Sequence, residues 1–297
     1  MPHPAFQYEA AENPLRLFRF AHEPLNLLAI YNPQASDYQM PIAVITGSSS
    51  GIGQATALAM AQRGYDLLLH ARGNLLGLQA TARQIGDEYS GTKVRCITAD
   101  FSCNRARRDF VQAAFAWQGS VAAWVNNAGA DVLTGASAAL PFLDRLERLW
   151  AIDVAATADL SRRAAVRMAD RPVANMSITN MGWDQAQMGM EGEPGQLFCT
   201  VKAAVEAFSR ALAMSVGPNI RVNCVAPGWI RTAWGQASTS EYWTKRAVAE
   251  SLSDRWGTPE DVAQCISWLT SEQASFVSGQ AISVNGGRRY FPANESE

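Results

Sequence analysis

The chain has 297 residues, of which 25 are lysine or arginine and 27 are aspartate or glutamate, and its formal net charge is −2. This balance excludes nucleic acid and anionic membranes as the expected main partners, because both select clustered basic charge. The five cysteines form no CxxC pair and the three histidines have no ligand spacing, so neither a disulfide framework nor a metal site is expected.

Residues 1–40 carry several prolines and no clean hydrophobic period. They are expected to form an N-terminal extension that packs on the domain or on a neighbouring subunit. The start of the chain lacks the basic, apolar and small-residue regions of a secretory signal. No apolar run reaches the length of about 18 residues that a membrane span needs. A cytoplasmic protein is therefore expected.

From residue 41 onward, short apolar stretches rich in β-branched residues alternate with helical patterns. Such stretches are typical of buried parallel strands. Helical periodicity is clearest over residues 54–63, 143–168 and 202–215. The seven predicted strands are PIAVIT, DLLLHA, VRCITAD, VAAWVNNAG, PVANMSI, IRVNCVAPG and AISVNGG.

Strands and helices that alternate at this spacing form βαβ units. The pattern predicts an α/β fold, in which a doubly wound, seven-stranded parallel sheet lies between two layers of helices. Residues 41–297 are expected to form this single domain. His70 lies inside an apolar stretch and is expected to serve packing rather than chemistry.

A glycine-rich run, TGSSSGIG over residues 46–53, stands directly between the first predicted strand and the first predicted helix. Glycines in this context allow a tight turn and a close approach of the backbone to a pyrophosphate. The helix that follows then directs its free N–H groups and positive dipole end at the phosphates. The run therefore predicts a dinucleotide site.

Further motifs make the chain resemble the short-chain dehydrogenase/reductase family over roughly residues 41–288. The resemblance implies a Rossmann-type fold, a nicotinamide cofactor, a small-molecule substrate, and a homodimer or homotetramer formed through the helices near residues 143 and 202. The motifs, in the family's order, are TGxxxGxG, Asp100 after the third strand, NNAG, KAAVEAFSRALA from Lys202, IRVNCVAPGWIRT and SGQAISVNGG. The cofactor contacts expected on this basis are Thr46, Gly47, Ser49, Ser50, Gly51, Ile52, Gly53, Arg72, Asp100, Phe101, Asn127, Ala128, Gly129, Lys202, Pro227, Gly228, Ile230 and Thr232.

The end of the second strand indicates which cofactor is bound. An acidic residue at this position accepts hydrogen bonds from the ribose hydroxyl of NAD(H) and repels a 2′-phosphate. Here the position holds Ala71, and Arg72 follows it. A guanidinium can hold the 2′-phosphate in a bidentate, charge-assisted pair. NADP(H) is therefore preferred over NAD(H), although Ser50 stands where many NADP-preferring relatives carry a basic residue.

Three of the four catalytic positions that the resemblance implies carry another residue. Lys202 matches the active-site lysine, but the tyrosine position four residues earlier holds Phe198, which has no exchangeable proton. The asparagine position holds Asp153. The serine position holds Ile178, and either Ser177 or Thr179 could replace that serine if the strand carried a one-residue bulge.

These changes predict either an already electrophilic substrate, such as an iminium or a conjugated acceptor, or another proton donor. Asp184, in the stretch after the fifth strand, is the first candidate donor and Asp153 is the second, while Thr179 could hold a substrate oxygen. Cys199 is expected to be a structural thiol.

The expected function is that of an NADP(H)-dependent reductase of a hydrophobic or aromatic small molecule. Tryptophans near the expected pocket favour such a substrate; they are Trp183, Trp229, Trp234 and Trp243. Three alternatives remain open at this point: a cofactor-binding protein without turnover, a non-redox enzyme on the same scaffold, and an engineered replacement of the tyrosine.

Overall fold

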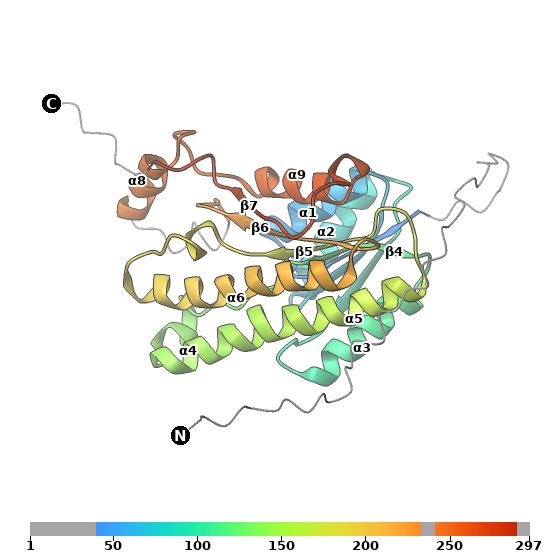
Figure 1. The fold of residues 1–297 in the computed structure, drawn as a ribbon, viewed down its shortest axis with the longest axis horizontal. Helices are drawn as coiled ribbons and strands as arrows, with labels where there is room; N and C mark the ends of the chain where they lie inside the picture. Colours follow the sequence, from blue (N-terminus) through green and yellow to red (C-terminus); the bar gives the residue numbers. More distant parts are fainter. Residues whose placement is uncertain (1–39, 233–240, 290–297) are drawn as a thin grey trace, which may run out of the picture. The chain divides into compact units, whose positions relative to one another are not determined.

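The computed structural model describes residues 40–232 and 241–289. Its seven strands form one parallel sheet in the order β3-β2-β1-β4-β5-β6-β7 (Figure 1). The chain starts in the middle of the sheet, winds to one edge, and returns to build the other half. The predicted doubly wound fold is thus confirmed. The strands are β1 (Ile42–Ile45), β2 (Asp66–Ala71), β3 (Val94–Thr98), β4 (Val121–Asn126), β5 (Ser177–Met181), β6 (Arg221–Pro227) and β7 (Ala281–Val284).

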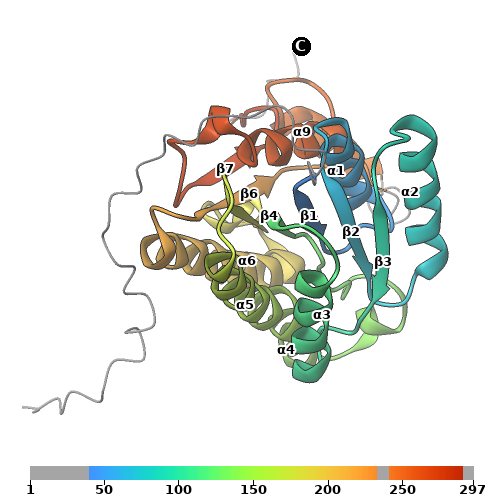
Figure 2. The ribbon, with the colours of Figure 1, turned by 90° about the vertical axis from the view of Figure 1, so that its right-hand side faces the viewer.

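Helices cover both faces of this sheet, as the three-layer prediction requires. Figure 2 shows α1, α2 and α9 on one face and α3, α5 and α6 on the other. No helix among the described residues combines the length and apolar character needed to cross a membrane. The helices are α1 (Gly51–Gln62), α2 (Leu75–Glu88), α3 (Asn104–Ala116), α4 (Phe142–Leu149), α5 (Thr157–Asp170), α6 (Gly192–Val216), α8 (Glu241–Glu250) and α9 (Pro259–Leu269).

The centre of the sheet supplies the core. Every residue of β1, β2 and β4 is buried, because helices cover both faces of these strands. Leu68 and Trp124, for example, have no exposed surface. Burial of one large apolar side chain contributes about 1.5–3 kcal/mol. Residues 1–39 of the predicted N-terminal extension lie outside the described residues.

Two boundaries differ from the sequence prediction. The fifth strand was predicted over residues 172–178, but β5 spans Ser177–Met181. The reason is a turn, in which Asn175 takes the left-handed backbone conformation with a φ of 58°. α6 also begins earlier than the helix predicted over residues 202–215, at Gly192. Pro194 stands in the first turn of α6, where an absent N–H costs no helical hydrogen bond.

The helix predicted over residues 143–168 is confirmed, but it is not uniform. Between α4 and α5, the residues Trp150–Ala156 form a π-helical segment. Such segments are uncommon and occur frequently at functional sites. This one contains Asp153, whose side chain is directed into the protein and is 2% exposed.

His70 lies in an aromatic column beneath the end of β2, and its predicted packing role is confirmed. Its ring stacks on Phe101 with a centroid distance of 3.9 Å, and Phe110 contacts both rings edge-on at 5.1 Å. The ring Nε2 lies 2.9 Å from the carbonyl oxygen of Ala99. Burial lowers the pKa of the imidazole from 6.5 to about 4.

This lowered pKa predicts a loss of stability in mild acid. Above pH 6.5 His70 is neutral in both states, whereas between pH 6.5 and about 4 mainly the unfolded chain binds a proton. The free energy of unfolding should therefore fall by about 2–3 kcal/mol over this window through His70 alone. In His70→Phe the fall between pH 7 and pH 4.5, measured by urea unfolding, should be smaller by that amount. Equal falls in both proteins would contradict the assignment.

Candidate active site

The glycine-rich loop leaves the carboxyl end of β1 and enters α1. Gly47 has a φ of +66°, which favours glycine. A Cβ at Gly53 would lie 2.1 Å from the carbonyl oxygen of Gly47, so any side chain there would push the loop off the helix. The loop thus keeps the backbone of the first helical turn accessible, as an approach by a pyrophosphate requires.

The end of β4 holds this loop in place. Thr46 Oγ1 accepts hydrogen bonds from the backbone N–H groups of Asn127 and Ala128, at 2.9 and 3.0 Å. The Asn127 side-chain amide donates to the carbonyl oxygens of Thr46 and Gly47, at 3.0 and 2.9 Å. Two of the sequence motifs therefore form a single hydrogen-bonded unit, in which the side chains of Thr46 and Asn127 hold the scaffold.

Arg72 follows β2 and Asp100 follows β3, and these two strands are neighbours in the sheet. Asp100 Oδ1 accepts a hydrogen bond of 2.9 Å from the backbone N–H of Ser102. That bond, and to a smaller extent the positive charge of Arg72, lowers the pKa of the Asp100 carboxyl. Arg72 is exposed, and among the described residues no carboxylate lies within ion-pair distance of it.

Lys202 of α6 and Asp153 of the π-helical segment form a buried ion pair, with 2.8 Å between Nζ and Oδ1. Asp153 Oδ2 accepts a hydrogen bond of 2.9 Å from the backbone N–H of Ala130, which follows the NNAG motif. Lys202 Nζ also donates to the carbonyl oxygen of Met181, at 3.2 Å. Both oxygens of the Asp153 carboxylate thus have a partner, one an ammonium group and the other an N–H group, as a buried charge requires.

Phe198 lies one helical turn before Lys202 and faces an aromatic neighbour. Its ring meets Trp183 edge-on, with 6.1 Å between the centroids. It also packs against a cluster of buried apolar residues contributed by the loop after β4, by α4 and by α6; these are Val132, Leu149, Leu197 and Val201. The surroundings of Phe198, one helical turn before Lys202, are therefore apolar.

The three residues considered for the serine position lie within β5 rather than at its end. Ile178 has no exposed surface, and Ser177 and Thr179 are buried as well. The strand runs on to Met181, so its carboxyl end is formed by Asn180 and Met181.

Asn180, at the carboxyl end of β5, lies beyond the predicted strand, which ends at Ile178. Its side-chain oxygen accepts from Asn126 at 2.8 Å, and its amide donates to Ser209 at 2.9 Å. Ser161 of α5 joins the same network. A polar pair that follows an apolar run, Thr179 and Asn180, was the available signal.

Asp184 lies apart from Lys202 and forms neither a hydrogen bond nor an ion pair with it. Its Oδ2 accepts a hydrogen bond of 3.1 Å from Asn285, and a Cβ at Gly228 would lie 3.2 Å from this oxygen. Its Oδ1 is buried without a hydrogen-bond partner. Burial raises the pKa of this carboxyl, although Asn285 and Arg288 partly offset the effect.

The tryptophans form two groups. Trp183 accompanies Phe198, whereas the Trp229 ring contacts those of Trp243 and Trp256 at centroid distances of 5.4 and 6.0 Å. Trp256 did not enter the sequence prediction, and Trp234 lies outside the described residues.

The thiol of Cys199 is bound within the structure. It donates to the carbonyl oxygen of Gln185 at 3.2 Å. Burial is the main cause of its raised pKa. A protonated, hydrogen-bonded thiol is a poor nucleophile.

The chain is similar to known proteins over most of its length. Residues 47–289 match the family model described as enoyl-(acyl carrier protein) reductase. The uncharacterized oxidoreductase YgfF of Escherichia coli K12 is 32% identical over 251 residues, which is 84% of this chain and 100% of the relative. The 3-oxoacyl-[acyl-carrier-protein] reductase FabG of Chlamydia muridarum is also 32% identical, over 82% of this chain and 96% of the relative.

A solved structure supports the same relationship. The blue fluorescent protein from a metagenomic library, in complex with NADPH, superposes with a TM-score of 0.73 at 29% identity. The match covers 83% of this chain and 97% of that one.

The ion pair predicts energetic coupling between its two residues. Asp153→Asn keeps the shape of the side chain and removes its charge, so the free energy of unfolding should fall by about 1–3 kcal/mol. Lys202→Met should lower the free energy of unfolding of the Asp153→Asn variant by at least about 1 kcal/mol less than it lowers that of the parent. Denaturant unfolding of the four proteins measures this, and strictly additive losses would contradict the pair.

Proposed function

Because the chain belongs to the short-chain dehydrogenase/reductase family of NAD(P)-dependent oxidoreductases, we propose that it is an NADP(H)-dependent reductase that works without the family's tyrosine acid. The observation that carries the proposal is the environment of Lys202. Its ammonium group is paired with Asp153, and the residue one turn earlier is Phe198. The proposed substrate is a hydrophobic small molecule that accepts hydride at an activated carbon.

The residues of the chain fit the proposed cofactor. The backbone of the glycine-rich loop would hold the pyrophosphate. The loop can pack this closely on α1 because Gly53 has no Cβ. Arg72 would hold the 2′-phosphate as an ion pair, and Asp100 would approach the adenine. NADPH, when bound, supplies the hydride.

The segment after β6 completes the proposed cofactor site. A Cβ at Gly51 would lie 3.5 Å from the Thr232 side chain, so this segment reaches the glycine-rich loop. On the resemblance, Pro227, Gly228, Ile230 and Thr232 would line the nicotinamide.

The polar groups around Lys202 limit the proton chemistry. Two of its three N–H bonds are directed at Asp153 and the Met181 carbonyl, which leaves one for the cofactor ribose or the substrate. Phe198 offers no proton, and positioned acid catalysis contributes roughly 10²–10⁴-fold to a rate. An iminium or a conjugated acceptor needs no proton at the moment of hydride transfer, so such a substrate suits this site.

The surroundings of Phe198 favour an apolar, flat substrate. Phe198 and Trp183 meet edge-on, and both residues are partly exposed. Aromatic walls bind aromatic or extended apolar groups through large buried area and preferred ring geometry. Asp184 remains the proposed proton source for a substrate that does require one, because burial of its carboxyl raises the pKa.

A second candidate function is cofactor binding without turnover, and the Lys202–Asp153 pair is what favours it. A lysine whose charge is already neutralised by a buried carboxylate has less electrostatic influence on a bound substrate. Such a protein would bind NADPH and consume none of it with any acceptor.

We also propose that the protein forms a homodimer or homotetramer through the face of α4 and α5. Large apolar side chains are exposed there, and burial against a second copy would remove them from water. They are Leu143 at 71%, Trp150 at 48% and Val166 at 48% exposure.

Phe198→Tyr separates the two candidate functions. The parent should reduce cyclic iminium ions with NADPH and leave simple ketones unchanged. The variant should gain ketone reduction by about 10²-fold or more, because the new phenol can donate a proton beside Lys202. NADPH consumption with a panel of both substrate types measures this. A parent that reduces ketones as fast as the variant, or a parent that binds NADPH and reduces nothing, would contradict the proposal.

Arg72→Ala tests the choice of cofactor. The affinity for NADPH should fall by about 10–100-fold, because a bidentate charge-assisted pair with the 2′-phosphate is lost. The affinity for NADH, which lacks this phosphate, should stay within about twofold. Arg83→Ala, at an exposed arginine of α2, is the matched control and should change neither value. Equal losses for both cofactors would contradict a role in phosphate recognition.

A further inference from the structure

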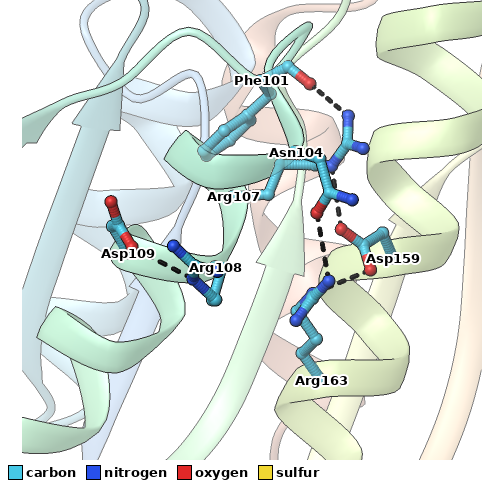
Figure 3. A network of polar contacts seen from close by, with 7 residues as sticks. All are labelled: Phe101, Asn104, Arg107, Arg108, Asp109, Asp159 and Arg163. Carbon is cyan, nitrogen blue, oxygen red and sulfur yellow. Dashed lines mark hydrogen bonds and ion pairs between the residues drawn. The ribbon is translucent and has the colours of Figure 1, made fainter.

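Phe101 lies in the turn Asp100–Phe101 that follows β3. This residue is held both through its ring and through its backbone carbonyl. The ring is 3% exposed and stacks on His70 at 3.9 Å. The backbone carbonyl oxygen accepts a hydrogen bond of 2.6 Å from Nη1 of Arg107, a residue of α3 (Figure 3). A charged donor makes this bond stronger than an ordinary backbone hydrogen bond.

Arg107 is itself held by a network between α3 and α5. Its side chain is 12% exposed, and its Nε donates to Asp159 Oδ2 at 2.8 Å. The other oxygen of Asp159 accepts from Arg163 at 2.7 Å. Arg163 in turn donates to the side chain of Asn104, the first residue of α3, at 3.1 Å (Figure 3). The start of α3 is therefore attached to α5 at two points.

The neighbouring arginine provides a contrast on the same helix. Arg108 is 60% exposed, and it pairs with the adjacent Asp109 at 3.3 Å (Figure 3). Exposed pairs of this kind contribute little to stability. Arg107 differs from Arg108 because it is mostly buried and because it bonds the turn next to the proposed adenosine end of the cofactor.

We infer that Arg107 is a positioning residue for the adenosine half of the cofactor, acting through the Phe101 carbonyl to fix the Asp100–Phe101 turn. The inference rests on the proposed function. Asp100 and Arg72, which interact electrostatically, form the rim that would receive the adenosine and its phosphate. Without Arg107 the carbonyl would lose its partner and the turn would relax away from this rim.

The inference predicts an effect confined to one half of the cofactor. The adenosine side of the site is built from β2 and β3, whereas the proposed nicotinamide side follows β6, and three strands separate β2 from β6. A loosened turn after β3 should therefore weaken binding of the adenosine half and leave the nicotinamide half unchanged. A general loss of folding would weaken both halves together.

The experiment measures dissociation constants by calorimetry for NADPH, adenosine 2′,5′-bisphosphate and reduced nicotinamide mononucleotide. Arg107→Met should weaken the first two by about tenfold and change the third by less than about twofold. Arg107→Lys, which retains one donor, should lie between the parent and Arg107→Met. Arg108→Met is the matched control and should behave like the parent.

Two results would overturn the inference. One is unchanged affinity of Arg107→Met for the bisphosphate, and the other is an equal loss for the bisphosphate and the mononucleotide. If Arg107→Met does not fold, Asp159→Asn decides instead, because it leaves the Phe101 bond in place and removes the charge that orients the guanidinium. It should weaken the bisphosphate selectively but by less. Failure of the parent to bind NADPH would contradict the proposed function itself. This outcome is distinct from failure of the inference, which is seen only in the arginine variants.

Discussion

The buried ion pair between Lys202 and Asp153 is the constraint on which the chemistry of this site depends. A carboxylate that is 2% exposed needs a compensating charge, and Lys202 supplies it at 2.8 Å. The lysine is thereby fixed between the π-helical segment, the end of β5 and α6. With Phe198 one turn away, the position next to this charge is apolar, which is the basis for proposing hydride acceptors that need no immediate proton.

The rest of the structure holds this pair next to the proposed dinucleotide site. The N–H of Ala130 that binds Asp153 follows the same segment whose Asn127 secures the glycine-rich loop. One short stretch after β4 therefore connects the glycine-rich loop with the charged centre. On the face of the sheet that α6 also covers, the network from Phe101 through Arg107 to Asp159 reaches α5, the helix that continues from the segment carrying Asp153.

The sequence predicts the sheet well because its strands are buried on both faces, which leaves unbroken apolar runs such as DLLLHA. It misplaces β5, because Val173 and Ala174 look like the start of a strand and the turn at Asn175 leaves no apolar signature. Asp153 and Lys202 could be named from the family resemblance. Their ion pair could not, because it depends on a π-helical segment that hydrophobic periodicity does not reveal. The pair of Arg107 and Asp159 is not predicted, because the two residues lie on different helices and no local sequence pattern relates them.

Isotope effects test the absence of a proton donor most directly. The measurement is the rate of reduction of a conjugated enone, which takes up a proton as well as a hydride, with NADPH or its 4-deuterated form, in H₂O and in D₂O. The account predicts a primary isotope effect from the deuterated cofactor and no solvent isotope effect on the same step. A normal solvent isotope effect that accompanies hydride transfer would contradict it, because it would require a proton in flight from a group of the protein.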